Sequence, residues 1–211
     1  PTGILGPYGQ RTELTVNGSG YLATIKNPAN EQTTLSYGSG GLLTSFTDAR
    51  TNSWTVTYDA AGRLTLDADP VGGFKMLSRT DTSNGFHITL STALARTNRY
   101  EVARLTNGAR LRTYTFPTGE QAQYEERTDG SIINRFPDGS VSTVVLGPDP
   151  RWSVLAPVEV TNMIVTPGGL TNLAMAQRSA TLSNVADPFS LISWSETNSY
   201  NGRKYGSVYR A

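Results

Sequence analysis

A period of 21 residues runs through the first third of the chain and restricts its fold more than any other feature of the sequence. Glycine, leucine, tyrosine and a turn-forming aspartate or asparagine each return at this spacing. Several columns in one phase are typical of a structural repeat, because a low-complexity stretch does not keep its glycines and leucines in register. The repeated residues are Gly20, Gly41 and Gly62; Leu22, Leu43 and Leu64; Tyr37 and Tyr58, with Val16 before them; and Asn27, Asp48 and Asp69.

Each repeat reads as two β-strands and two turns. Trp54, Val56 and Tyr58 alternate with small polar residues, which is the period-2 pattern of a half-buried strand. A tight turn follows at residues 59–62, where Gly62 is able to adopt positive φ. Residues 63–67 form the returning strand, on which we expect Leu64 and Leu66 to share one face.

The composition supports strands and excludes several classes of protein. Thr (28) and Ser (19) make up 47 of 211 residues, and both residues disfavour helix interiors. Basic and acidic residues number 18 and 17 and are scattered, so we expect no nucleic-acid partner. The absence of cysteine excludes disulfides and thiolate zinc sites, and a single histidine excludes a multi-histidine metal site. No apolar run approaches the ~18 residues of a membrane span, so we expect no membrane insertion.

The remainder of the chain keeps the hairpin rhythm with other turn motifs. Residues 91–152 contain turns of the Pro-Thr-Gly and Pro-Asp-Gly type, and Asn-Gly or Asp-Gly pairs indicate two-residue hairpin loops. Residues 153–211 again alternate strands with turns. We therefore predict three segments: repeat hairpins over 1–90, further hairpins over 91–152, and a C-terminal strand segment over 153–211. One short irregular helix over residues 91–100 is the alternative at that place.

The repeat resembles the tyrosine–aspartate (YD) repeat of the Rhs/YD-repeat family. Residues 48–68 carry the resemblance best, through Asp48, Tyr58, Asp59 and the Gly62-Arg63-Leu64 run. Residues 27–47 match less well because Gly38 replaces the aspartate after Tyr37. Residues 6–26 match weakly, and residues 207–211 resemble the start of another repeat.

This resemblance implies an all-β fold, in which consecutive antiparallel hairpins form a curved, spiralling sheet of the open β-shell or solenoid-like kind. It also implies a large bacterial protein of which this chain is a segment. The family includes polymorphic toxins, insecticidal toxin components, adhesion proteins and wall-associated proteins, and its shell is not an enzyme. Asp69-Pro70-Val71-Gly72 is only a passing likeness to the family's self-cleavage motif, because it lies inside the repeat frame.

The candidate catalytic residues are explained more simply by structure. His87 lies in a strand pattern without serine or cysteine partners at a recognisable spacing. Glu125 and Glu126 are adjacent on a predicted strand and point to opposite faces, so they cannot serve one two-carboxylate site. Asp67 and Asp69 share a face, but Asp69 occupies the turn slot of the repeat; a Ca²⁺ site there needs 6–8 oxygen ligands and is the weaker alternative.

Three aromatic residues of the repeats form the candidate binding site. Trp54, Tyr37 and Tyr58 would make a glycan-stacking strip if they were exposed, whereas packing within a core is the plainer interpretation. The glycines at 38–41 link two strands rather than a strand to a helix, so they do not form a phosphate-binding loop.

We therefore expect a non-enzymatic structural segment of a secreted or cell-surface protein, without cofactor or metal. Its partners would be other repeats of the same larger protein or identical copies paired at sheet edges. The chain begins at Pro1 without a signal peptide, which favours a piece of a longer protein or a processed chain. Two alternatives remain: a self-assembling extracellular fibre subunit, and an adhesin module that binds carbohydrate.

Overall fold

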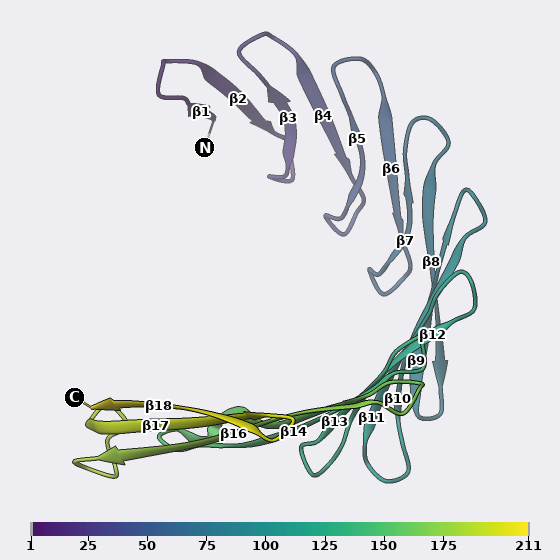
Figure 1. Cartoon of the computed structure of the whole chain (residues 1–211). Helices are drawn as coiled ribbons and strands as arrows, with labels where there is room; N and C mark the ends of the chain where they lie inside the picture. The colour runs from purple at the N-terminus through teal and green to yellow at the C-terminus, as the bar shows by residue number, and fades with distance from the viewer. Residues whose placement is uncertain (1, 211) are drawn as a thin grey trace. The chain divides into compact units, whose positions relative to one another are not determined.

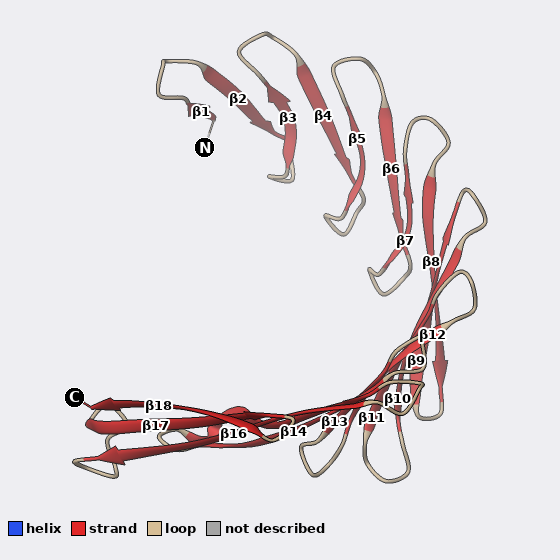
Figure 2. Ribbon diagram, viewed as in Figure 1, coloured by secondary structure: helices blue, strands red, loops and turns tan. Residues whose placement is uncertain are grey.

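The computed structural model describes residues 2–210, and these residues form strands and turns without a helix (Figures 1 and 2). The predicted all-β fold of consecutive antiparallel hairpins is confirmed. Residues 91–100, the one candidate helix, instead contain the end of one strand, a turn and the start of the next strand. The strands are β1 Gly3–Leu5, β2 Arg11–Val16, β3 Leu22–Lys26, β4 Gln32–Tyr37, β5 Leu43–Thr47, β6 Ser53–Tyr58, β7 Leu64–Ala68, β8 Phe74–Thr82, β9 Gly85–Thr92, β10 Thr97–Arg104, β11 Arg110–Thr115, β12 Gln121–Glu126, β13 Ile132–Arg135, β14 Val141–Asp149, β15 Ser153–Val165, β16 Thr171–Leu182, β17 Leu191–Tyr200 and β18 Arg203–Arg210.

The chain divides into two compact units. Unit 1 comprises residues Pro1–Thr80 and Ile88–Asn98, and unit 2 comprises Asp81–His87 and Arg99–Ala211. Strands β8, β9 and β10 contribute residues to both units. The three segments predicted from turn motifs are a different kind of division, based on sequence pattern rather than on contacts, and they stay a prediction.

Strands within each unit pair with their neighbours in sequence, always antiparallel. In unit 1 the ladder runs from β1 to β8, with pairs such as Phe46 opposite Trp54. In unit 2 it runs from β10 to β18. The loops that connect paired strands are therefore short and local, because each strand returns beside the strand that precedes it.

A three-residue loop joins most strands and explains the repeat length. In the loop after β6, the Asp59 N–H donates to the Arg63 carbonyl at 2.9 Å, and the Gly62 N–H donates to the Asp59 carbonyl at 2.9 Å. This is a type I turn closed by a left-handed residue, here Gly62 at φ 76°. Two successive loops and their strands together make one repeat, and the equivalent loops begin at Asn17, Asn27, Gly38, Asp48, Asp59 and Asp69.

The same loop corrects the two-residue hairpins predicted at Asn107-Gly108, Asp129-Gly130 and Asp138-Gly139, whereas Asn201-Gly202, at φ 49° and 85°, does form a two-residue loop between Tyr200 and Arg203. Asn107, Asp129 and Asp138 occupy the middle loop position, and the glycine that follows each of them is the left-handed residue. Proline precedes Asp138 at the first loop position, where its fixed φ suits a type I turn. A two-residue type I′ loop would need positive φ at both central residues, and none of the three polar residues adopts it.

A β-bulge next to the tyrosine of each repeat reassigns the faces of the returning strand. Tyr58 pairs with Leu64, whereas its neighbour Thr57 pairs with Leu66. Leu64 and Leu66 therefore lie on opposite faces, and the expectation that they share one is wrong. The physical reason is the extra residue of the bulge, since two residues of one strand oppose one of the other and the alternation is shifted by one.

Unit 1 has two chemically different faces. Leu35, Phe46, Trp54 and Val56 belong to one face through cross-strand pairing. The opposite face carries mainly threonine and serine, together with Leu66 and Met76, and the hydroxyls of Thr15 and Thr24 lie 2.6 Å apart. No described residue of unit 1 is buried, so the apolar face has no second layer over it.

The described chain accordingly has very little core. Ala103, Ala109 and Ile133, all in unit 2, are its buried hydrophobic residues. The chain exposes 14096 Å², whereas a compact protein of 22.7 kDa is expected to expose about 9,500 Å². Cross-strand pairing therefore holds these strands together more than burial does.

Candidate functional site

The three predicted glycan-stacking residues lie on the apolar face of unit 1 and are half-buried. Trp54 stacks on Phe46 across β5 and β6, with ring centroids 4.5 Å apart and planes at 5°. Tyr37 stacks on Tyr21 at 5.1 Å. One ring face of Trp54 and one of Tyr37 are thus covered by another aromatic ring. Because this face lacks a second layer, packing within a closed core does not describe these residues either.

A hollow of about 460 Å³ lies beside Trp54 and brings together residues that sequence reasoning treated separately. Asp67 and Asp69 line it, and Lys75 and Arg96 add positive charge. The Asp69 carboxylate turns back to accept hydrogen bonds from the N–H groups of Val71 (2.9 Å) and Gly73 (2.8 Å). The remaining lining residues are Gly73, Phe74, Thr92, Ala93 and Leu94.

The aspartate of the repeat's Tyr-Asp pair stabilises the loop through hydrogen bonds. Asp59 Oδ1 accepts hydrogen bonds from the N–H groups of Ala61 and Arg63, each at 2.9 Å, and Oδ2 accepts one from Arg63 Nε at 2.8 Å. These bonds, first of all the one from the Arg63 N–H, hold the pKa of Asp59 below its ordinary value. Asp48 makes the equivalent bonds in its own loop, and its side-chain bond with Asn52 is the main cause of its lowered pKa.

Glu125 and Glu126 point to opposite faces of β12. Glu125 accepts hydrogen bonds from Arg127 Nε (2.8 Å) and Arg135 Nη1 (3.2 Å), and the bond from Arg127 is the chief reason that its pKa is lowered. Glu126 lies 3.6 Å from Arg112 on the other face. The two carboxylates are therefore structural ion-pair partners rather than a catalytic pair.

His87 and the metal-ligating residue types form no recognisable centre. His87 Nδ1 lies 3.3 Å from Arg99 Nη2, and the same guanidinium donates to Glu101 at 2.7 Å. Within residues 2–210, no three histidine or acidic side chains gather in a way that would hold a metal ion. The same residues contain no helix long and apolar enough to cross a membrane.

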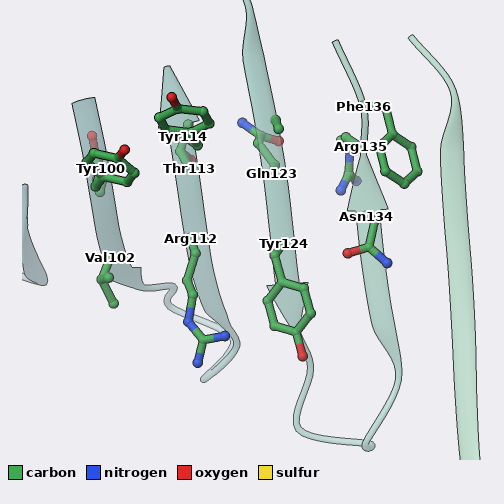
Figure 3. A pocket seen from close by; sticks show the side chains of 12 residues that line it. Tyr100, Val102, Arg112, Thr113, Tyr114, Gln123, Tyr124, Asn134, Arg135 and Phe136 are labelled. Carbon is green, nitrogen blue, oxygen red and sulfur yellow. The ribbon is translucent and has the colours of Figure 1, made fainter. Parts of the chain in front are cut away.

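A second hollow, of about 360 Å³, lies on one face of unit 2 over strands β10–β13 (Figure 3). Tyr100 and Tyr114 face each other across β10 and β11, with ring centroids 4.7 Å apart. Tyr124 follows on β12, and the guanidinium of Arg112 lies 5.0 Å from the centre of its ring. Phe136, directly after β13, completes a row of aromatic side chains on successive strands.

The sequence did not reveal this aromatic hollow. Its rings follow no fixed period along the chain, at Tyr100, Tyr114, Tyr124 and Phe136, because loop lengths differ between these hairpins. The one available signal is the odd or even position of each residue along its strand, which decides the face of the sheet that its side chain occupies. That signal is informative only once the register is known, since a one-residue slip moves a side chain to the opposite face.

The fold and its turns define a class of protein, an all-β YD-repeat scaffold built from antiparallel hairpins. The family model of the Teneurin YD-shell matches residues 2–203 of this chain. The chain therefore belongs to the Teneurin YD-shell family, and the resemblance to YD-repeat proteins is confirmed.

Two further comparisons add little to this assignment. No curated protein matches the chain. Among solved structures, a porin-like protein from Bacteroides uniformis ATCC 8492 is 13% identical, and the match covers 94% of this chain and 86% of that one. The TM-score of 0.31 is too low to support any conclusion about structure or function.

Proposed function

We propose that the chain is a non-enzymatic wall segment of a larger secreted or cell-surface YD-repeat protein, where it builds an extended β-sheet scaffold or shell. The observation that carries this proposal is the match of residues 2–203 to the YD-shell family. The repeated loop geometry supports it, because a series of similar hairpins extends a sheet without needing a core of its own.

The two faces of unit 1 give the proposal its physical content. One face carries aromatic and aliphatic side chains and the other carries hydroxyls, yet no described residue of the unit is buried. Uncovered apolar surface of this kind costs free energy in water. In a wall that separates an interior from solvent, the hydroxyl face would be open to solvent and the apolar face would be covered.

Cysteine labelling tests the proposal, because these 211 residues contain no cysteine of their own. Val56→Cys reports on the apolar face and Thr55→Cys, its neighbour on β6, reports on the hydroxyl face. In the larger protein we expect a maleimide to label Thr55→Cys and to label Val56→Cys much more slowly, while both react in the denatured protein. Equal labelling of both positions in the folded protein would contradict a wall with two environments. Fractionation of cells and medium tests the location separately.

Glycan binding is the second candidate, favoured by the hollow beside Trp54. An aromatic ring flanked by carboxylates and cations supplies both a stacking surface and hydrogen-bond partners for hydroxyl groups. Trp54→Ala should then abolish retention on a glycan array while Trp152→Ala does not. An array on which the unmodified chain finds no ligand would remove this candidate.

Pairing between sheet edges is the remaining proposal for partners. Within its own unit, β18 pairs with β17 alone, and all eight of its residues are exposed. Such a strand presents free N–H and C=O groups to another strand. A self-assembling fibre subunit would then sediment as an oligomer at high concentration, whereas a monomer would argue against assembly of identical copies.

A further inference from the structure

The face that holds the aromatic hollow is basic over strands β10 and β11. Alternation along the strands places Arg104, Arg110 and Arg112 on this face together with the rings of Tyr100, Tyr114 and Tyr124. Arg104 lies directly opposite Arg110 in the ladder, and like charges in that position destabilise a sheet. An anion at this place would remove that penalty.

The acidic residues of these strands only partly offset the charge. Glu126 shares the face and lies 3.9 Å from Arg110 and 3.6 Å from Arg112. Glu101 and Glu125 point to the opposite face, where each is engaged by an arginine, Glu101 by Arg99 at 2.7 Å. On this face of β10–β12, three guanidiniums against one carboxylate leave a net charge of +2, and of these four groups Arg112 lines the hollow.

The lining of the hollow favours a flat apolar ligand over a sugar. Ring and aliphatic carbons dominate it, from Tyr100, Tyr114, Tyr124, Phe136 and Val102. The hydroxyls of Tyr114 and Tyr100 share a hydrogen bond, so two of the tyrosine hydroxyls are engaged with each other. Glu101, Thr113, Gln123 and Arg135 also line the hollow, but their positions in the ladder place their side chains on the opposite face. Arg112 and Asn134 are the remaining polar side chains on the face of the hollow, which is few for a ligand that carries a hydroxyl on almost every carbon.

We propose that this hollow binds a planar aromatic molecule that carries an anionic group. The ring would stack against Tyr114, Tyr124 and Phe136, and the anion would lie beside Arg112 on the side of Arg110. Its volume of about 360 Å³ falls within the range of small-molecule sites. Arg112 already lies along the ring of Tyr124, so its guanidinium is held at the edge of the aromatic row (Figure 3).

A pair of fluorescent probes tests both halves of the proposal on the 211-residue chain. The first is 8-anilinonaphthalene-1-sulfonate, an aromatic anion, and the second is N-phenyl-1-naphthylamine, the same ring system without the sulfonate. Arg112→Gln should weaken binding of the sulfonate about tenfold, because one charge-assisted contact is lost. It should change binding of the uncharged probe less than twofold.

Matched variants separate the hollow from unspecific adsorption. Arg99→Gln removes a guanidinium from the opposite face and should leave both affinities unchanged. Tyr114→Leu keeps apolar bulk but removes a stacking ring, and should weaken both probes. Thermal unfolding of each variant serves as the control for folding.

Three results would overturn the proposal. The first is equal loss of sulfonate binding in Arg112→Gln and Arg99→Gln. The second is equal loss of both probes in Arg112→Gln. The third is displacement of the sulfonate by a uronic-acid oligosaccharide at lower concentration than by naphthalene-1-sulfonate, which would assign the hollow to carbohydrate.

Discussion

Gly20 and Gly41 occupy the same loop position in successive repeats but have different surroundings, which allows two effects of one substitution to be separated. Both adopt left-handed backbone, at φ 84° and 76°. A methyl group added at Gly20 meets no atom within 4 Å, whereas one added at Gly41 would collide with the hydroxyl of Tyr21. Tyr21 belongs to the preceding repeat, so this contact links one repeat to the next.

The expected losses follow from these surroundings. A side chain in left-handed backbone costs about 1–2 kcal/mol, and alanine recovers about 0.4–1 kcal/mol by restricting the unfolded chain. Gly20→Ala should therefore lower the free energy of unfolding by about 1 kcal/mol. Gly41→Ala carries the same cost and also displaces the exposed end of Tyr21 from its stack with Tyr37, worth about 0.5–1.5 kcal/mol. We expect the loss at Gly41 to total about 2 kcal/mol.

Urea denaturation followed by far-ultraviolet circular dichroism measures both variants against the unmodified chain. A double-mutant cycle with Tyr21→Ala isolates the contact: in that background the cost of Gly41→Ala should fall to the value for Gly20→Ala. Equal losses for the two glycine variants, or a cost at Gly41 that Tyr21→Ala does not change, would refute the reasoning that the tyrosine packs over the glycine of the next repeat.

Five other substitutions test the loop, the ion pairs and the aromatic row. Asp59→Ala should lower the free energy of unfolding at pH 7. Because folding lowers the pKa of Asp59, the stability that its carboxylate contributes is present above about pH 4 and is lost as pH falls through the folded pKa. The urea midpoints of the variant and the unmodified chain should therefore converge in acid. Asp59→Asn should keep most of the stability, because an amide oxygen still accepts the loop N–H groups, and a loss equal to that of alanine would contradict this. Glu125→Gln should cost about 1–2 kcal/mol in the same assay, whereas Glu126→Gln should cost less than about 0.5 kcal/mol, because Glu126 is exposed and its contacts are longer. The hydrogen bond between the hydroxyls of Tyr114 and Tyr100 raises the pKa of Tyr114, and the stability that it contributes is present below about pH 10 and lost as pH rises through the folded pKa. Tyr114→Phe should therefore reduce the tyrosinate absorbance that develops above about pH 10, and a loss confined to lower pH would argue against the bond.

Much of the fold was predictable because its causes are local. The alternation of Trp54, Val56 and Tyr58 predicts a strand without reference to any other part of the chain. Gly62 predicts a turn because only glycine takes positive φ without strain. The same local causes return in each repeat and indicate hairpins in series.

The face of each side chain was less predictable because it depends on the loop that joins two strands. The bulge beside Tyr58 places Leu64 and Leu66 on opposite faces, although simple alternation along β7 predicts that they share one. Asn107-Gly108 reads as a two-residue loop in isolation, yet a third residue belongs to it. Each extra residue reverses the alternation that follows it.

The sequence by itself therefore determined the kind of protein: an all-β chain of YD-repeat hairpins, without cysteine chemistry and without a visible catalytic centre. Only the tertiary structure decided which side chains meet. Trp54 came to lie beside Asp67, and Tyr100, Tyr114 and Tyr124 came to share a face with three arginines. Secondary structure follows from neighbours along the chain, whereas a binding surface on a sheet follows from hydrogen-bond register, which links residues that are far apart in sequence.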